Sequence, residues 1–145
     1  MSDSNQMTRR IAESFNQQSA MATLGVILED VQQGQITLSL SHAPHILQQQ
    51  GFIHGGVICS VLDSACGYSA LSVAPEGHEV LTIELKTSFL RPASSGRLLV
   101  KGRVLKAGRR VSYTEAEAFA EDDGKQILVA KMSSTLAIVA VSVDI

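Results

Sequence analysis

The stretch "GFIHGGVICSVLDSACGYSA", residues 51–70, contains the pattern on which the fold depends. From Gly55 to about residue 73 the chain is almost entirely small or apolar, and the run is too long for a strand. Its bulkier residues recur at intervals of three and four, which predicts a buried central helix. Asp63 lies in the middle of this helix with no basic residue within eight positions on either side. Because a buried carboxylate without a partner is unfavourable, Asp63 is the first candidate functional residue.

Shorter periodic segments surround this helix. They are an amphipathic helix over residues 7–20, a β-hairpin of residues 24–31 and 35–40, and four strands that begin near residues 81, 97, 109 and 125. Turns are expected at Ala107-Gly108 and at residues 122–124. This order predicts an α+β domain in which an antiparallel sheet carries nearly all its helix on one face. The small residues of the long helix would let a strongly curved sheet wrap closely around it.

Composition narrows the class of protein. The chain has 145 residues, 45% of them hydrophobic, and a formal net charge of −2, which fits one globular domain over residues 1–145. We expect residues 1–6 to be flexible. No broad basic excess indicates a nucleic-acid partner, although local arginines could hold a phosphorylated small ligand. The N-terminus is too polar for a signal peptide and no apolar run approaches 18 residues, so we expect a cytoplasmic protein without membrane contact.

The thiols and imidazoles indicate neither a disulfide nor a metal centre. Cys59 and Cys66 are seven residues apart in the predicted helix, which puts both on one face, pointing the same way. This arrangement fits a buried, reduced pair in a reducing compartment. His42 and His45 share a loop that has no Cys or carboxylate at ligand spacing, so we expect no metal site.

The start of the long helix is a second candidate site. The first backbone N–H groups of a helix lack partners inside the helix, and at Gly55 and Gly56 no side chain shields them. They could polarise a carbonyl, or the two glycines could simply make a tight turn. His54 could act in catalysis or cap the helix. Asp63 could be a general base or nucleophile in a partly dry pocket, or a carboxylate that faces solvent or bonds to a neighbouring strand.

Together these residues resemble a known family. "HGGVICSVLDSACGYSA" is similar to the signature of hotdog-fold acyl-CoA thioesterases of the phenylacetate-degradation and 4-hydroxybenzoyl-CoA thioesterase-like group, with an acidic residue nine positions after the histidine. "LTIELKTSFLRPASSGRLLVKGRVLKAGRR" resembles the family's long strand, its Arg-Pro break and its Gly-Arg turn. The resemblance spans about residues 20–140. It implies a hotdog fold, a curved antiparallel sheet around a long central helix, and hydrolysis of an acyl-CoA thioester.

The resemblance also implies roles for single residues. The backbone N–H of Gly55, next to His54, would polarise the thioester carbonyl, and Asp63 of the other subunit would activate water or attack directly. Gln48 occupies the position of an amide that orients the reacting groups. Some branches pair Asn at that position with Asp on the helix, and others pair Gln with Glu. The combination of Gln48 with Asp63 therefore leaves open whether water attacks the thioester directly or through an acyl-enzyme anhydride. Thr82 is the nearest match to a strand hydroxyl that holds the water in some branches.

For the rest of the substrate, the resemblance implies contacts with coenzyme A. The expected substrate-binding residues are Gly56, Arg91, Gly108, Arg109 and Arg110, although the three arginines could equally solvate strand ends. Coenzyme A is then part of the substrate and no separate cofactor is expected. The family also implies self-association, as a homodimer or homotetramer with sheets paired edge to edge.

Two other functions stay open on the sequence. A non-catalytic acyl-CoA binding module could keep the pocket without the chemistry, although Gln48, Gly55 and Asp63 together weigh against it. A hotdog hydratase or dehydratase would act by proton transfer on similar substrates. Its relatives carry a His-Phe-Pro segment or an Asp and His close together before the helix, and this chain has neither.

Overall fold

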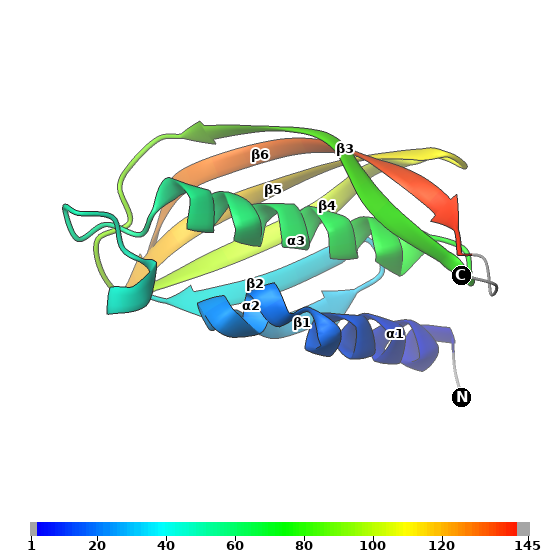
Figure 1. Ribbon diagram of the computed structural model, residues 1–145, viewed down its shortest axis with the longest axis horizontal. Coiled ribbons are helices and arrows are strands. Elements are labelled where there is room, and N and C mark those ends of the chain that lie inside the picture. Colours follow the sequence, from blue (N-terminus) through cyan, green and yellow to red (C-terminus); the bar gives the residue numbers. More distant parts are fainter. Residues whose placement is uncertain (1–2, 142–145) are drawn as a thin grey trace.

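The computed structural model describes residues 3–141 (Figure 1). The helices are α1 (Asp3–Gln17), α2 (Ser19–Leu24), the 3-10 helix η1 (Pro44–Ile46) and α3 (Gly55–Val73). The strands are β1 (Ile27–Gln32), β2 (Gln35–Ser41), β3 (His78–Phe89), β4 (Arg97–Ala107), β5 (Val111–Asp122) and β6 (Lys125–Ala140). The predicted order of helix, two strands, long helix and four strands is therefore confirmed, with α2 and η1 added.

The N-terminal helix differs from the prediction in its bounds. Helix α1 begins at Asp3, so residues 3–6, which we expected to be flexible, are helical, while the expectation for residues 1–2 lies outside the described residues. The predicted helix over residues 7–20 is two helices, because Gln18, at the N-cap position of α2, adopts an extended conformation. Ile11 and Phe15 of the predicted apolar stripe are buried.

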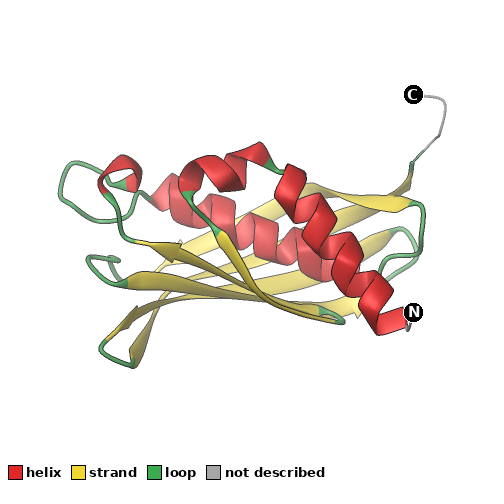
Figure 2. Ribbon diagram, turned by 90° about the horizontal axis from the view of Figure 1, so that it is seen from below, coloured by secondary structure: helices red, strands yellow, loops and turns green. Residues whose placement is uncertain are grey.

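All six strands form one antiparallel sheet in the order β1-β2-β4-β5-β6-β3. Helix α3 lies across one face of this curved sheet, and α1 and α2 lie on the same side (Figures 1 and 2). The sheet and α3 enclose the core, in which aliphatic residues such as Leu38, Leu98 and Met132 meet Val61 and Leu62 of the helix. The fold is the predicted α+β hotdog arrangement.

Small residues let β4 pass close to α3. A Cβ atom on Gly102 of β4 would lie 2.5 Å from the backbone oxygen of Ala65, and 2.9 Å from the hydroxyl of Ser69. Real side chains do not tolerate such distances to a backbone atom, so only glycine allows this approach. Ala116 and Ala118 of β5 are also small and fully buried. This close packing supports the expectation that the sheet wraps tightly around the helix.

Helix α1 closes the side of α3 that the sheet leaves open. The ring of Phe15 meets that of Tyr68 edge to face, with centroids 5.8 Å apart. The guanidinium of Arg10 donates hydrogen bonds to the backbone oxygens of Ala74 and Pro75, which follow α3, and of His78, the first residue of β3. A cation at a helix C-terminus also interacts favourably with the helix dipole. Arg10 therefore ties α1 to the connection between α3 and β3.

Strand β3 forms one edge of the sheet, and within residues 3–141 it pairs only with β6. Its register shifts between Thr82 and Glu84, which makes Ile83 an extra residue in the strand. Such a β-bulge turns side chains to new directions and is common next to functional sites. Leu81 and Ile83 are more than half exposed, although they are large and apolar. An exposed, apolar edge strand is a surface suited to pairing with another strand.

Two expectations from the sequence, that both cysteines are buried and that no apolar segment is long enough to span a membrane, are only partly met. Both cysteines are free thiols, as predicted, but only Cys66 is buried, because Cys59 lies on the partly open face of α3. By length and composition α3 would be long and apolar enough to cross a membrane, with a mean hydropathy of 1.4, contrary to the expectation of no such segment. Most of it (61%) is buried inside the protein, which is the environment of a core helix.

Candidate active site

Asp63 is held by the neighbouring edge strand. The hydroxyl of Thr82 donates a hydrogen bond of 2.8 Å to Oδ1 of Asp63. Asp63 is partly buried, in the middle of α3, and Thr82 immediately precedes the bulge of β3. A hydroxyl that donates to a carboxylate makes a strong, directional contact and leaves the second oxygen free for other partners. The structure thus places two of the predicted catalytic residues in contact.

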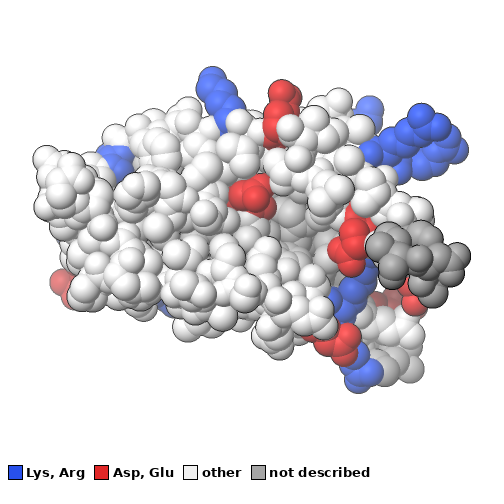
Figure 3. All heavy atoms as spheres, viewed as in Figure 1, with Lys and Arg blue, Asp and Glu red and all other residues white. Residues whose placement is uncertain are grey.

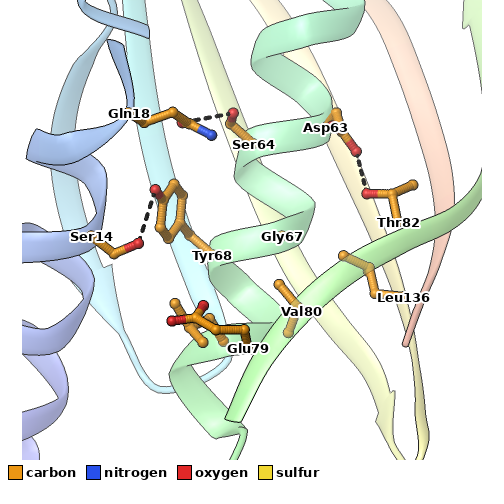
Figure 4. A pocket seen from close by; sticks show the side chains of 11 residues that line it. Ser14, Gln18, Asp63, Ser64, Gly67, Tyr68, Glu79, Val80, Thr82 and Leu136 are labelled. Carbon is orange, nitrogen blue, oxygen red and sulfur yellow. Dashed lines mark hydrogen bonds between the residues drawn. The ribbon is translucent and has the colours of Figure 1, made fainter. Parts of the chain in front are cut away.

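A cavity of about 220 Å³ opens beside this pair, which we call the Asp63 cavity (Figure 4). It lies between α3 and the first half of β3, with α1 on its far side. Its lining residues are Ser14, Gln18, Asp63, Ser64, Gly67, Tyr68, Leu71, Glu79, Val80, Thr82 and Leu136. More than half of these side chains are polar, and several bond to one another. The hydroxyl of Ser14 donates to that of Tyr68 at 3.3 Å, and Ser64 donates to the side-chain oxygen of Gln18 at 3.2 Å.

The two glycines at the start of α3 have different surroundings. The N–H of Gly56 donates to Nδ1 of His54 at 2.8 Å, so His54 caps the helix. A Cβ on Gly56 would lie 3.0 Å from the His54 ring, so this cap requires a small residue there. Because Nδ1 accepts, the proton of a neutral His54 is on Nε2. The donor of Gly56 is therefore already engaged, which leaves Gly55 as the better candidate to polarise a carbonyl.

Gly55 lies in a separate pocket of about 350 Å³, which we call the Gly55 pocket. Its lining residues are Gln48, Phe52, Ile53, Gly55, Ile58, Phe89, Leu90, Arg91, Pro92 and Ala93. The ring of Phe89 lies over Gly55, at 3.4 Å from where a Cβ would be. Gln48 is near, as predicted, but its amide is engaged in its own loop. Its oxygen accepts from the N–H groups of Gln50 and Phe52, and its nitrogen donates to the Gln50 side chain.

The two pockets are separate in one chain. Gly55 and Asp63 are eight residues apart on α3, or about 12 Å along the helix axis. A carbonyl that accepts a hydrogen bond from the Gly55 N–H is therefore out of reach of the Asp63 carboxylate of the same chain. The structure brings Asp63 together with Thr82, and Gly55 together with Gln48 and His54, but it does not unite the two groups.

The predicted arginines are also separated. Arg91 lines the Gly55 pocket and donates to the backbone oxygen of Leu128 at 2.8 Å. Arg109 and Arg110 are exposed in the turn after Gly108, and the oxygen of Arg110 accepts from the N–H of Ile138. Leu128 and Ile138 are ten residues apart on β6, about 30 Å in an extended strand. Figure 3 shows one face on which Lys and Arg lie mainly toward the margins.

The sequence model of the Thioesterase superfamily matches residues 50–127, which include α3 and the Gly-Arg turn. The chain belongs to the Thioesterase superfamily. A thioesterase family protein of Silicibacter pomeroyi is 37% identical, with a TM-score of 0.90 over 92% of this chain and 98% of that chain. The hotdog fold and thioester hydrolysis, both expected from the resemblance, are confirmed.

One curated relative and one further solved structure are also similar to this chain. The medium/long-chain acyl-CoA thioesterase YigI of Salmonella typhimurium is 28% identical over 127 residues, 77% of this chain and 80% of YigI. The PaaI protein from the phenylacetic acid degradation operon of E. coli has a TM-score of 0.86 over 96% of this chain and 97% of PaaI. At 19% identity, PaaI is evidence for the fold alone.

In this thioesterase, Asp63 and the N-terminus of α3 are the groups suited to the reaction. Hydrolysis of a thioester needs donors that stabilise a developing oxyanion and a base or nucleophile at the carbonyl carbon. Within residues 3–141 no three His, Cys, Asp or Glu side chains form a group that could hold a metal ion. Burial raises the pKa of the Cys66 thiol to about 12, so this cysteine is a poor nucleophile.

Several residues of the Asp63 cavity were not predicted. Ser14 lies on α1 and Gln18 at the N-cap position of α2, in the segment predicted only as an amphipathic helix, and Tyr68 lies on α3. Burial raises the pKa of the Tyr68 hydroxyl, with the hydrogen bond from Ser14 opposing that effect. Contacts between α1 and α3 depend on tertiary packing, and no local pattern reports them.

Proposed function

We propose that this thioesterase hydrolyses acyl-CoA thioesters at a site shared by two copies of the chain. The observation that carries the proposal is the position of Asp63, bonded to Thr82 and beside a cavity, yet about 12 Å along α3 from the free donor of Gly55. Each copy would supply one half of the site. The acyl-CoA substrate is supported by the resemblance and by the named activity of the relative YigI.

The geometry of α3 supports a two-fold arrangement of two copies. If two α3 helices lie antiparallel about an axis near residue 59, Gly55 of each copy comes opposite Asp63 of its partner. Strand β3 runs alongside α3 in the opposite direction, since Phe89 lies against Gly55 and Thr82 contacts Asp63. The same two-fold axis would therefore pass near the middle of this part of β3. The midpoint of residues 82 and 89 is between Leu85 and Lys86. Pairing of the two β3 edges about that point would continue the sheet and cover its exposed apolar residues.

The reaction then follows from the groups at this shared site. The thioester oxygen accepts from the Gly55 N–H, at the positive end of the helix dipole, so the carbonyl carbon becomes more electrophilic. As a base, Asp63 takes a proton from water while the water oxygen bonds to that carbon. The tetrahedral intermediate then collapses, the carbon–sulfur bond breaks and the thiolate of coenzyme A takes the proton from Asp63.

As a nucleophile, Asp63 would follow a different sequence of bonds. A carboxylate oxygen attacks the carbon, the thiolate leaves, and water then hydrolyses the mixed anhydride to the acid and regenerates Asp63. Thr82 holds Oδ1 in both routes, so Oδ2 faces the substrate. A single turnover in ¹⁸O-labelled water, followed by mass spectrometry of the peptide that contains Asp63, tests the nucleophilic route. If water attacks the mixed anhydride at the Asp63 carbonyl, Asp63 gains ¹⁸O, whereas in the general-base route it gains none.

The remaining predicted residues keep supporting roles in the proposal. Gln48 would orient the reacting groups after its amide turns out of its own loop, and Gly56 and His54 would hold the start of α3 in place. Arg91 would be near the thioester end of coenzyme A, and Arg109 and Arg110, after Gly108, near its phosphates. Because Arg91 is far from the other two in one chain, this arrangement also needs a second copy, as a dimer or within a tetramer.

The test of the proposed function is Asp63→Asn, which keeps the shape of the side chain and removes its charge. Release of coenzyme A from a panel of acyl-CoAs is followed with a thiol reagent, and light scattering gives the oligomeric state. We expect kcat to fall by about 100-fold or more, with KM and the melting temperature nearly unchanged. Binding of acyl-CoA by the wild-type protein without thiol release would indicate a non-catalytic module. A variant at the wild-type rate would exclude Asp63 from the chemistry.

A further inference from the structure

Gly67 lies one helical turn after Asp63 and lines the same cavity (Figure 4). It faces Val80 of β3 and Leu136 of β6, which form the opposite wall. Glycine in the interior of a helix lowers stability relative to alanine, because it has more backbone freedom to lose. A glycine at this point of α3 therefore needs a reason.

The backbone and the packing give none. Gly67 is in ordinary helical conformation, since its φ is not among the positive values of the chain. A Cβ there would lie 3.9 Å from Cδ2 of Leu136 and 4.0 Å from Cγ2 of Val80, which are ordinary contact distances. At Gly102, by contrast, close packing does require glycine, because a Cβ there would lie 2.5 Å from a backbone oxygen. Folding requires glycine at position 102 and tolerates alanine at position 67.

What a side chain at position 67 would remove is space in the Asp63 cavity. The cavity begins at the carboxylate of Asp63, and Gly67 forms its wall one turn further from the carbonyl position. We propose that Gly67 is the residue that sets the size of the acyl group this thioesterase accepts. This inference rests on the proposed function, because it takes the Asp63 cavity as the place of the acyl group.

The volume gives the class of acyl group. An apolar cavity of about 150 Å³ holds one benzene molecule, or about 25 Å³ for each non-hydrogen atom. On this scale the 220 Å³ of the Asp63 cavity hold an acyl group of about nine non-hydrogen atoms. The substrate class is then an aryl-acyl or short to medium aliphatic acyl-CoA, up to about octanoyl. A long-chain acyl group would extend beyond the cavity.

The experiment compares Gly67→Ala and Gly67→Val with the wild type on propanoyl-CoA and octanoyl-CoA. Propanoyl-CoA is the internal control, because its acyl group ends before position 67. We expect kcat/KM for octanoyl-CoA to fall by about tenfold in Gly67→Ala and about 100-fold in Gly67→Val, and kcat/KM for propanoyl-CoA to stay within about threefold. The melting temperature of Gly67→Ala should rise by about 2–4 °C, because alanine is the better helix former.

A compensating change separates a role in the cavity from a general effect on structure. Val80 faces position 67 and is only partly buried on the edge strand, so Val80→Ala restores space without removing a central core residue. In the double variant Gly67→Val/Val80→Ala, we expect octanoyl-CoA turnover to recover at least tenfold relative to Gly67→Val. Light scattering on each variant checks that the oligomeric state is unchanged.

The possible results have different meanings. If both substrates lose activity equally in Gly67→Val, or if the profile of acyl lengths does not change, Gly67 does not set the size of the acyl group. Loss of the wild-type oligomer in Gly67→Ala would assign the glycine to an interface between copies and overturn the inference. These outcomes leave the proposed function intact, provided that Asp63→Asn is inactive. Wild-type protein without thioesterase activity on any acyl-CoA would instead overturn the proposed function.

Discussion

The hydroxyl of Thr82 on the edge strand donates a 2.8 Å hydrogen bond to the carboxylate of Asp63 on the central helix. The two residues are 19 positions apart in the sequence, and the bulge at Ile83 follows immediately. This contact fixes one oxygen of Asp63 and so fixes the direction of the other. Thr82 is a positioning residue in the proposed reaction, because it reaches the substrate through Asp63.

Removal of the Thr82 hydroxyl should therefore impair turnover more than binding. In Thr82→Val, which keeps the shape, we expect kcat to fall about tenfold, because the carboxylate loses its fixed orientation. KM should change by less than about threefold and the free energy of unfolding by about 1 kcal/mol or less. Thr82→Ser keeps a donor and is the matched control. If Val and Ser variants have equal kcat, the hydrogen bond has no role in positioning Asp63.

The donor at Gly55 can be removed without breaking the helix. Gly55 is the first residue of α3, where proline is favoured although it has no N–H, and His54 before it has ψ of 134°, which proline permits. We expect Gly55→Pro to lower kcat about 100-fold, as for loss of an oxyanion donor. Gly55→Ala keeps the N–H and should stay within about tenfold of the wild type. Equal losses in both variants would indicate a steric effect instead.

The same variant tests whether the site is shared. Gly55→Pro and Asp63→Asn damage different halves, so a mixed dimer of the two contains one intact site. After the subunits are exchanged, activity should return to roughly a quarter of the wild-type value, because half of the dimers are mixed and each has one site of two. Sites built within single chains would show no recovery on mixing.

Arg10 should stabilise the protein, and its neighbour Arg9 should not. The guanidinium of Arg10 donates to the backbone oxygens of Ala74, Pro75 and His78, between the end of α3 and the start of β3, and two of these three bonds are partly buried. Hydrogen bonds from a charged group contribute more than neutral ones, so Arg10→Ala should lower the free energy of unfolding by about 2 kcal/mol. Arg9→Ala, on the exposed side of the same helix, should change it by less than about 0.5 kcal/mol. Urea unfolding of both variants measures the difference.

The two thiols should react at very different rates. Burial raises the pKa of Cys66 to about 12, although a hydrogen bond with Thr114 opposes this, so we expect no alkylation of Cys66 in the folded protein at pH 8. Cys59 is partly exposed and should be alkylated first. Mass spectrometry of peptides after iodoacetamide treatment assigns the label. Rapid labelling of Cys66 without unfolding would contradict the packing of α3 against β5.

The same shift predicts how stability depends on pH. The pKa of Cys66 is higher in the folded protein than the ordinary value of 9.0, so above pH 9 the unfolded chain releases a proton that the folded chain keeps. The contribution of Cys66 is fully present below about pH 9 and is lost as the pH rises toward 12. Cys66→Ala should unfold with a smaller decline in stability over that range, and an unchanged decline would contradict the shift.

Much of the fold was contained in local patterns of the sequence. Helix α3 begins and ends where its apolar run predicts, because the cap at His54 and the change of period after residue 73 are local features. The turn at Asp123-Gly124 also has a local cause, since both residues adopt the left-handed conformation. The candidate residues Gly55 and Asp63 were found because a glycine pair and a lone carboxylate are unusual in such a run.

The arrangement of the site was decided by tertiary structure. Thr82 contacts Asp63 because β3 pairs with β6 at the edge of the sheet, beside α3, and a bulge in that pairing has no signal in the alternation of side chains. The Ser14–Tyr68 pair depends on how α1 docks on α3, and Arg91 is separated from Arg110 by the length of β6. The Gly55–Asp63 separation follows from helical rise, whereas only the folded chain shows that, within residues 3–141, the two pockets have no lining residue in common. Side-chain periodicity reports which face of an element is buried, and it does not report which residue of another element lies opposite.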